Sequence, residues 1–488
     1  MEWSREERYQ RLEDIDKEKY NKLIEKVENS NYRQKFHIQP KTGLLNDPNG
    51  FSYFEGRYHL FYQWFPLGPV HGVKYWYHVS SKDLVFWEDE GIGMKPDTIY
   101  DSHGVFSGSA IEKDDRLYLF YTGNTRDKNW NRNPYQCIAI MNKKGEITKE
   151  KIPFVMSPPE GYTDNFRDPK VLKKDKMYYC VIGTEDKDNR GKIVYYESKD
   201  LHNWNFKGEI KTKFTNENTG FMWECPDYFE IGNKGILMFS PQGIKPEGDL
   251  YNNVFQSGYL IGDPINFETG EFLYKNFVEL DRGFDFYAPQ TMEDSEGRRI
   301  LIGWFGLPEI NCITDIDGWA HCLTLPRILE VVDNKLIQNP VPELKKLRKE
   351  SYKIEEEIDG EFLIDNKFRT YELKILFENI KNKDVGIKFR VGEKEECVFY
   401  YSSNEKKLVL DRTKTEQLEA KEYGTVRKCA FEEENLKLHV FLDESSIEIF
   451  VNDGIEVFSS RLFNNKESNK ILLFSSEKIK VETEVWEI

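Results

Sequence analysis

The stretch His37-Ile-Gln-Pro-Lys-Thr-Gly-Leu-Leu-Asn-Asp-Pro-Asn-Gly50 decides the fold, because its last four residues open a pattern that returns along the chain. Taken alone, Asp47-Pro48-Asn49-Gly50 favours a type I turn, with Asp first, Pro second and Gly fourth. Residues 51–63 then form an apolar run, a Glu-Gly turn and a second apolar run. This succession predicts two antiparallel β-strands that follow the turn.

The same pattern occurs five times in the chain. Each unit has a short motif, a strand, a turn and a second strand, and continues to a third strand such as those at 75–81, 136–141 and 192–198. The aligned positions are separated by 60, 61, 57 and 63 residues, and they are Pro48, Gly108, Pro169, Pro226 and Pro289. Five units of about four short strands predict an all-β fold that begins with a five-bladed β-propeller.

Acidic residues begin the first strand in four of the five units, at Asp47, Asp168, Glu224 and Asp285. In a propeller the first strand of each blade lies nearest the central axis. Corresponding positions should therefore face one another across that axis. Carboxylates packed so closely repel one another unless each has a separate task. One or two such acids are explained as turn formers, whereas four on one axis predict an active site.

Composition excludes several classes of protein. The 488 residues carry a formal net charge of −16, which argues against nucleic acid or an anionic membrane as a partner. A mean hydropathy of −0.68 argues against a membrane-spanning helix. The lack of an apolar leader argues against secretion. The seven cysteines form no Cys-x-x-Cys pair, so neither zinc nor a disulfide framework is predicted. We expect a cytoplasmic protein without metal or other cofactor, and the oligomeric state stays open.

The chain divides into four predicted parts. Residues 1–35 form a helical extension, because apolar residues recur at helical spacing over 4–30, and this amphipathic helix should dock on the main body. The propeller is expected over 36–330, and a linker with a short helix over 331–350. Alternating strands over 351–488, with a hairpin signal at Asn452-Asp453-Gly454, predict an antiparallel β-sandwich. We expect this sandwich to brace the propeller and not to bind sugar.

Two facing carboxyl groups, one ionised and one protonated, are what hydrolysis of a glycosidic bond requires. Asp47 precedes Pro48 and has potential hydrogen-bond donors in the backbone and in the side chain of Asn46, which predicts an ionised nucleophile. Glu224 lies between Trp223 and Cys225, and an apolar pocket raises the pKa of a carboxyl group. Glu224 is therefore the predicted general acid.

Asp168 and a set of aromatic residues complete the predicted site. The fixed charge of the adjacent Arg167 should keep Asp168 ionised, so that it binds sugar hydroxyls and stabilises the transition state. Aromatic side chains suited to stacking on a sugar ring, or equally to filling the propeller core, are Trp64, Phe65, Tyr75, Trp76, Phe106, Tyr287 and Trp304.

The ordered motifs resemble those of the glycoside hydrolase family of invertases and fructan hydrolases. They are 46–50 (Asn-Asp-Pro-Asn-Gly), 106–109 (Phe-Ser-Gly-Ser), 167–169 (Arg-Asp-Pro), 224–226 (Glu-Cys-Pro), 319–327 and 445–454. The resemblance covers nearly the whole chain from about residue 33. It implies a five-bladed propeller followed by a sandwich, and hydrolysis of β-D-fructofuranosides with retention of configuration.

The resemblance also implies roles for individual residues. Asp47 would be the nucleophile, Glu224 the acid/base and Asp168 the stabiliser of the transition state. The residues implied to bind the fructosyl unit are Asn46, Gln63, Phe106, Ser107 and Arg167.

The chain departs from the family pattern in two places. Leu44-Leu45 replaces the usual Trp-Met before the nucleophile, and His71 stands where many members have Trp. The sequence around His71, together with 319–322, is most similar to bacterial sucrose-6-phosphate hydrolases, which act in the cytoplasm. We therefore expect His71 and Lys74, in the loop before Trp76, to bind a phosphate at the mouth of the site. An ordinary surface loop is the alternative.

Rival functions remain open at this stage. A fructan hydrolase or a fructosyltransferase would use the same fold and the same covalent intermediate. A non-catalytic fructan-binding protein would be expected to lack one of the three acids, and all three are present. The expected partner is in each case a small sugar, such as sucrose 6-phosphate, sucrose or a short fructan.

Overall fold

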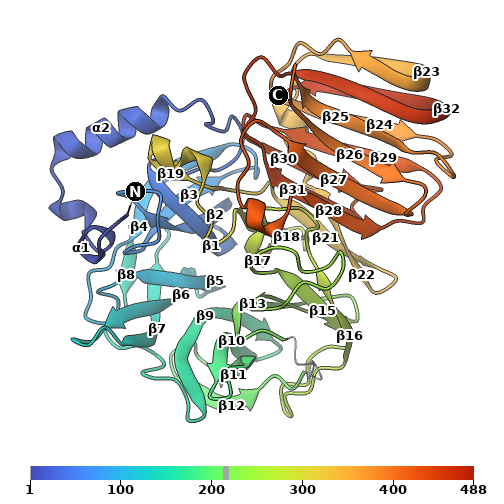
Figure 1. Cartoon of the computed structure of the whole chain (residues 1–488). Coiled ribbons are helices and arrows are strands. Elements are labelled where there is room, and N and C mark those ends of the chain that lie inside the picture. The colour runs from blue at the N-terminus through green and yellow to red at the C-terminus, as the bar shows by residue number, and fades with distance from the viewer. Residues whose placement is uncertain (1, 213–218) are drawn as a thin grey trace.

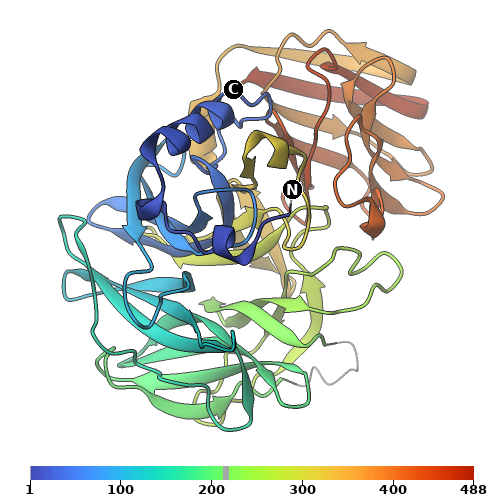
Figure 2. The ribbon, with the colours of Figure 1, turned by 60° about the vertical axis from the view of Figure 1, so that its left-hand side comes forward.

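The computed structural model describes residues 2–212 and 219–488. It has two β-rich bodies side by side, with the N-terminal helices lying on the first of them (Figures 1 and 2). Within those ranges, none of the helices has the length and apolar character needed to cross a membrane.

The N-terminal extension consists of separate short helices, so the prediction of one helix over 4–30 was wrong. The helices are α1 (Arg5–Arg8), η1 (Leu12–Asp14) and α2 (Lys17–Glu28). Ser4 caps α1, and the Asp16 carboxylate accepts hydrogen bonds from the backbone of Glu18 and Lys19, which starts α2 afresh. The predicted docking is confirmed, because Tyr9 and Leu12 pack against the main hydrophobic core.

Five antiparallel sheets form the blades of the predicted propeller (Figure 1). Blade one contains β1 (Gly43–Phe54), β2 (Arg57–Phe65), β3 (Tyr75–Ser81) and β4 (Trp87–Met94). Blade two contains β5 (Val105–Lys113), β6 (Arg116–Arg126), β7 (Arg132–Met141) and β8 (Ile147–Lys149). Blade three contains β9 (Tyr162–Lys174), β10 (Met177–Asp186), β11 (Gly191–Ser198) and β12 (Asn205–Glu209).

The last two blades follow the same order of strands. Blade four contains β13 (Met222–Ile231), β14 (Lys234–Gln242), β15 (Gly258–Gly262) and β16 (Tyr274–Glu279). Blade five contains β17 (Tyr287–Glu293), β18 (Arg299–Phe305), β21 (Arg327–Val332) and β22 (Lys335–Pro340), with β20 (Cys322–Leu323) also paired to β18. The first strands β1, β5, β9, β13 and β17 contact one another in a ring, so the first strand of each blade is the innermost one, as predicted.

The ring is closed by a segment that lies between blade-five strands in the sequence. After η2 (Ile313–Asp317), β19 (Trp319–Ala320) pairs in parallel with the start of β1, where Gly43 lies opposite Trp319. This pairing joins the last blade to the first one and covers the edge of β1 at its first two residues.

Part of the predicted linker at 331–350 belongs to blade five. Asp333 and Asn334 both adopt a left-handed backbone conformation, with φ of 50° and 61°. A two-residue hairpin requires this conformation, so the chain turns back and β22 completes the sheet. The short helix expected in this region is present as η3 (Pro342–Leu347).

The C-terminal body is the predicted antiparallel sandwich. Its elements are β23 (Ser351–Ile364), β24 (Tyr371–Phe377), β25 (Val385–Val391), β26 (Glu396–Ser402), β27 (Lys407–Lys414), η4 (Lys421–Tyr423), β28 (Val426–Ala430), β29 (Leu436–Leu442), β30 (Ser446–Val451), β31 (Glu456–Arg461) and β32 (Lys470–Glu487). Strand β32 pairs with β23 on one edge and with β25 and then β24 on the other, so it contributes to both layers. The hairpin predicted at 452–454 joins β30 to β31. Phe441, Phe450 and Val457 of the sandwich enter the largest core of the propeller.

Candidate active site

Three of the predicted carboxylates meet at the inner strands, on β1, β9 and β13. The Cys225 thiol lies between two of them, with its Sγ 3.7 Å from Asp47 Oδ2 and 3.6 Å from Asp168 Oδ2. The backbone N–H of Cys225 donates to Asp168 Oδ2 at 2.9 Å. Glu224 precedes this cysteine and is itself half-buried. Residues that are 121 and 56 positions apart in the sequence, at 47, 168 and 224, therefore form one cluster.

A β-bulge at each acid explains how its side chain is directed toward this cluster. The strand registers shift between Leu45 and Pro48 in β1, and between Glu224 and Asp227 in β13. Asp168 and Cys225 have positive φ values of 66° and 48°, a conformation that is uncommon outside glycine. A bulge bends its strand and re-aims a side chain, and such bulges are frequent next to active sites.

Asp47 is surrounded by hydrogen-bond donors, as the sequence predicted. Its carboxylate accepts hydrogen bonds from Asn46 Nδ2 at 3.0 Å, from Gln63 Nε2 at 3.3 Å and from the Ser107 hydroxyl. Burial nevertheless raises the pKa of Asp47 above its usual value, and the hydrogen bonds from Ser107 and Asn46 offset only part of this effect. The predicted binding residues Asn46, Gln63 and Ser107 thus lie directly against the predicted nucleophile.

Glu224 lies in a polar environment, so the prediction of an apolar pocket was wrong. Its Oε1 accepts two hydrogen bonds from Arg167, at 3.0 and 2.8 Å, and its Oε2 accepts from Gln242 Nε2 at 2.8 Å and Tyr287 Oη at 2.7 Å. The ring of Trp223 instead stacks in the blade interior, 4.4 Å from that of Phe239. Successive side chains of a strand face opposite sides, so sequence neighbours do not describe the environment of Glu224.

Asp168 is buried, with 5% of its surface exposed. Burial raises its pKa, the nearby carboxylates of Glu224 and Asp47 raise it further, and Arg167 acts in the opposite direction. Arg167 therefore lowers the pKa of Asp168, as expected, but burial and the neighbouring carboxylates raise it by more. Arg167 Nε lies 4.0 Å from Asp168, whereas it forms its short hydrogen bonds with Glu224.

The fourth predicted acid, Asp285, does not belong to the cluster. It precedes β17 by two residues, and its Oδ2 accepts hydrogen bonds from the backbone N–H of Arg461 at 2.8 Å and from Arg412 Nη1 at 3.3 Å. Both partners belong to the sandwich. Asp285 was grouped with the acids that begin the inner strands, but its position before the strand directs it to the boundary between the two bodies.

The predicted aromatic residues divide into core and site residues. Trp76 and Trp304 are 0% and 1% exposed, so neither presents a ring face for stacking on a sugar. Their role in substrate binding stays a prediction. Trp76 Nε1 donates to the Phe106 carbonyl at 3.1 Å, and the Phe106 ring stays partly exposed. Tyr287 is buried but contacts Glu224 through its hydroxyl. The remaining candidates are also buried in the core, and they are Trp64, Phe65 and Tyr75.

The two predicted phosphate ligands lie in different places. His71 is exposed, and its ring centroid lies 6.0 Å from that of Trp304. Lys74 is only 3% exposed, and its Nζ donates to Asn46 Oδ1 at 2.7 Å. Burial lowers the pKa of Lys74 to about 7, against the opposing effect of Asp47. Lys74 is therefore a buried support of Asn46 and not a phosphate ligand at the mouth.

Gln242 and Asn165 belong to the site although no sequence motif indicated them. Gln242 ends the second strand of blade four and donates to the acid of that blade, as Gln63 does in blade one. This equivalence within the repeat is the signal that would have found it. Asn165 Oδ1 accepts from both Arg167 and Arg132, at 3.1 and 3.0 Å, and no feature of the repeat indicates this.

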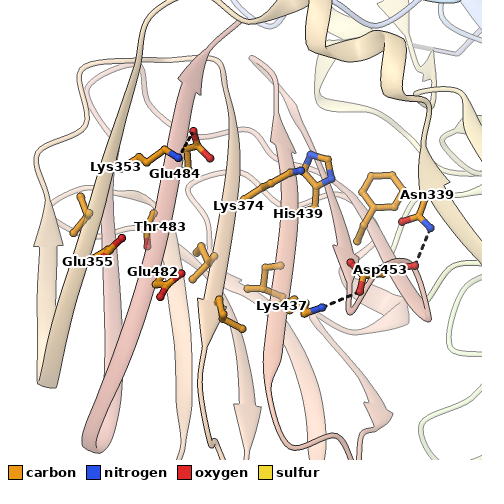
Figure 3. A pocket seen from close by; sticks show the side chains of 15 residues that line it. Asn339, Lys353, Glu355, Lys374, Lys437, His439, Asp453, Glu482, Thr483 and Glu484 are labelled. Carbon is orange, nitrogen blue, oxygen red and sulfur yellow. Dashed lines mark hydrogen bonds and ion pairs between the residues drawn. The ribbon is translucent and has the colours of Figure 1, made fainter.

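The sandwich carries a groove of about 320 Å³ across β24, β29 and β32 (Figure 3). Its lysines include Lys353, which pairs with Glu484 at 3.2 Å, and Lys437, which pairs with Asp453 at 3.1 Å. Phe450 lines the groove but is only 1% exposed. The groove therefore offers no exposed aromatic ring for stacking on a sugar. Over residues 2–212 and 219–488, no group of three or more His, Cys, Asp or Glu side chains is arranged to hold a metal ion.

Comparison with known proteins agrees with this geometry. Residues 37–340 match the N-terminal domain of glycosyl hydrolases family 32, and residues 343–487 match the C-terminal domain of the same family. Sucrose-6-phosphate hydrolase of Staphylococcus xylosus is 47% identical over 480 residues, covering 96% of this chain and 95% of that protein. The corresponding enzyme of Bacillus subtilis is 40% identical and covers 95% of each chain.

Solved structures show the same likeness over the whole chain. A sucrose-6-phosphate hydrolase from Lactobacillus gasseri superposes with a TM-score of 0.93 at 36% identity, covering 100% of this chain and 99% of that one. A mutant β-fructofuranosidase of Bombyx mori in complex with sucrose gives a TM-score of 0.83 at 33% identity, covering 98% and 99%. The chain therefore belongs to glycosyl hydrolases family 32.

Proposed function

We propose that the protein hydrolyses the β-fructofuranosidic bond of sucrose 6-phosphate, and of sucrose, and releases fructose. The observation that carries this proposal is the cluster of Asp47, Asp168 and Glu224, in which each carboxylate has a different set of partners. The relatives that match over nearly their full length are named sucrose-6-phosphate hydrolases, and these names support the choice of substrate.

The proposed reaction proceeds through a covalent fructosyl-enzyme. Asp47 attacks the anomeric carbon of the fructosyl unit while Glu224 gives its proton to the glycosidic oxygen, which leaves with the glucosyl unit. Glu224 then takes a proton from water, and this water attacks the same carbon and releases Asp47. Two displacements give retention of configuration. Asp168 stabilises the positive charge that develops on the sugar ring.

The partner sets favour this division of roles. The donors Asn46, Gln63 and Ser107 orient the Asp47 carboxylate for attack. Tyr287 and Gln242 hold one oxygen of Glu224 and Arg167 holds the other, so its carboxyl group has a fixed position beside the bond that breaks. Fixed positions of this kind contribute to catalysis because the reacting groups need not be reoriented during the reaction.

A substrate panel tests the proposal. The purified protein is assayed on sucrose 6-phosphate, sucrose, raffinose and inulin, with products resolved by chromatography. We expect fructose from sucrose 6-phosphate with the highest kcat/KM and from sucrose with a lower one. A preference for inulin would instead identify a fructan hydrolase, and oligofructosides formed at high sucrose would identify a fructosyltransferase.

We also propose a cytoplasmic location for this reaction. All seven cysteines are free thiols, and six of them are buried. Reducing compartments keep thiols in this state, whereas secreted proteins commonly use their cysteines in disulfides. Fractionation of the native cells with antibody detection would test this, and recovery outside the cytoplasmic fraction would contradict it.

A further inference from the structure

We propose that a group of basic side chains beside the acid/base binds the phosphate of the substrate's glucosyl unit; this inference rests on the proposed function. We call this group the arginine cluster. It consists of Arg5, Arg11, His103, Arg126 and Arg132. Lys74 is buried and cannot contact a phosphate at the mouth of the site. The arginine cluster is therefore proposed as the phosphate site in place of Lys74.

The arginine cluster is assembled from the N-terminal extension and blade two around the ring of Trp130. Arg126 ends β6 and lies opposite Arg132, which begins β7. The guanidinium carbons of Arg5 and Arg126 lie 4.2 and 5.9 Å from the Trp130 ring centroid. The His103 ring lies 5.4 Å from the same centroid.

The remaining contacts tie the N-terminal extension to this place. The Tyr9 ring packs against both Trp130 and His103, at 5.1 and 5.5 Å. Arg11 Nη2 donates to the Ser102 carbonyl at 3.3 Å, next to His103. The extension therefore contributes basic groups to the rim of blade two in addition to its apolar contacts with the core.

The cluster lacks the counter-charges that surround other arginines of this molecule. Throughout the described ranges, none of its five side chains forms an ion pair with a carboxylate. Arg126 Nε is buried and has no hydrogen-bond partner among the described residues. Four guanidinium groups without carboxylate partners in one place are unexpected in a chain with a net charge of −16. A bound dianion would supply the missing partner.

The mutual effects of these groups point in the same direction. Burial and the neighbouring charges of Arg167 and Arg126 together lower the pKa of Arg132 to about 10. Burial also lowers the pKa of His103, and the positive charges of Arg126 and Arg11 act in the same direction. Positive charges that destabilise one another in the free protein are stabilised together by a phosphate. Guanidinium groups suit this ligand because two parallel N–H groups match two phosphate oxygens.

The cluster begins where the glucosyl unit must lie. Arg132 Nη1 and Arg167 Nη1 share Asn165 Oδ1, and Arg167 contacts Glu224 directly. Glu224 protonates the oxygen that links the fructosyl and glucosyl units, so the glucosyl unit leaves from beside this residue. A phosphate on its sixth carbon extends away from that oxygen toward the rim of the site. Two of the three lysines that line the sandwich groove contrast with this arrangement, because Lys353 and Lys437 already have carboxylate partners.

The test compares two charge-removing substitutions on the same strand. Arg126→Met removes a member of the cluster at one end of β6, and Arg116→Met removes an exposed arginine at the other end. Arg126→Met should lower the ratio of kcat/KM for sucrose 6-phosphate to that for sucrose by about ten- to a hundredfold, the effect of one charged hydrogen bond. Arg116→Met should leave the ratio within about twofold of wild type, since the change in net charge is identical.

Product inhibition provides a second readout that does not depend on turnover of the phosphorylated substrate. Inhibition of sucrose hydrolysis by glucose 6-phosphate should weaken about tenfold or more in Arg126→Met, whereas inhibition by glucose should not change. Arg132→Met should show the same selectivity, together with a loss on both substrates because it also releases Asn165.

Three results would overturn the inference. An equal loss on both substrates in Arg126→Met would mean that the cluster only anchors the N-terminal extension. An equal fall of the ratio in Arg116→Met would mean that overall charge, and not the cluster, sets the selectivity. A wild-type protein that releases fructose from neither sugar would overturn the proposed function and this inference with it, whereas the first two results leave the proposed function intact.

Discussion

Two groups of buried carboxylates lie in different regions of this molecule and differ in their partners. At the propeller axis, Asp47 and Asp168 lie close to a third carboxylate, that of Glu224, with one nearby arginine. At the boundary between propeller and sandwich, Asp443 and Glu448 flank His37, whose Nδ1 and Nε2 lie 2.8 and 3.1 Å from their oxygens.

The pKa values of the two groups shift in opposite directions. Burial raises the pKa of a carboxyl group in both places. At the boundary this effect is outweighed by His37 for Asp443, and by Arg327 together with His37 for Glu448, so both pKa values are lowered. Burial acts to lower the pKa of His37, yet its two hydrogen-bonded carboxylates raise it to about 9. At the axis no comparable cation outweighs burial, and the pKa values of Asp47 and Asp168 stay raised.

The comparison separates structural from chemical use of the same residue type. A buried carboxylate with a matching cation is stable as an ion and holds two bodies together. A buried carboxylate with too few cations is poised between its charged and neutral forms, which is a property of groups that transfer protons or attack substrates. Substitutions at the axis should therefore act on turnover, and substitutions at the boundary on stability.

Asp47→Asn should abolish turnover at the axis. The amide cannot form the fructosyl-enzyme, so kcat for sucrose should fall by about three decades or more. The fold should survive because Asn46, Gln63 and Ser107 still have a polar partner of the same size, which a thermal unfolding scan would check. A variant that kept a tenth of the wild-type kcat would contradict the assignment of the nucleophile.

Glu224→Ala should lower kcat by about two to four decades, because general acid–base catalysis contributes on that order. The loss should be smallest for a substrate whose leaving group needs no proton. Azide should restore part of the turnover by attacking the fructosyl-enzyme, and the product should be a β-fructosyl azide. An α-fructosyl azide would indicate a single displacement and rule out the retaining mechanism.

Glu448→Gln should act on stability and not on chemistry. Its carboxylate is fully buried and accepts from His37, from the Leu325 backbone and from Arg327. Loss of the charge leaves two buried cations under-compensated, which costs about 3–5 kcal/mol. The thermal unfolding midpoint should fall clearly while kcat at 25 °C stays within about threefold of wild type.

The matched control for this prediction is Glu484→Gln. Glu484 pairs with Lys353 at 3.2 Å on the surface of the sandwich, and an exposed pair of this kind contributes less than about 1 kcal/mol. Its unfolding midpoint should therefore stay close to that of wild type. Equal midpoints for the two variants would contradict the structural role of the boundary group.

Much of this architecture could be predicted because it repeats. The period placed Asp47, Asp168 and Glu224 on inner strands, and the structure brings them together. Local neighbours along the chain were a poor guide to environment. Glu224 was expected among apolar groups because Trp223 and Cys225 flank it, but a bulge and the alternation of the strand give it four polar contacts instead.

Depth was the other property that the sequence did not reveal. Lys74 lies in a loop-like stretch between Gly72 and β3, which suggested exposure. The sequence was equally compatible with Trp76 and Trp304 stacking on a sugar or filling the core. In the structure both fill the interior. The arginine cluster could not be predicted from the sequence, because Arg11 and Arg126 are more than a hundred residues apart and belong to no shared motif.

Lys74→Met has the smallest expected effect and tests how the axis group is supported. Lys74 holds Asn46 Oδ1, which turns the Asn46 amide nitrogen toward Asp47. Without this contact the amide is free to rotate, and kcat should fall by about fivefold to tenfold, equally for sucrose and sucrose 6-phosphate. A loss confined to sucrose 6-phosphate would instead make Lys74 a phosphate ligand.

The pH profile of the same variant gives the sharper measurement. Asp47 must be ionised to attack, so kcat/KM falls on the acid side as pH drops through the pKa of Asp47. The positive charge of Lys74 lowers that pKa, and Lys74 is protonated on the acid side because its own pKa is about 7. Removing Lys74 should therefore raise the pKa of Asp47 and move the acid limb of the profile to higher pH, by less than about one unit.

Lys82→Met is the matched control, because Lys82 is exposed and follows β3 where Lys74 precedes it. Its profile should coincide with that of wild type, and an acid limb that moves equally in both variants would show that long-range charge, and not the contact with Asn46, sets the ionisation of the nucleophile.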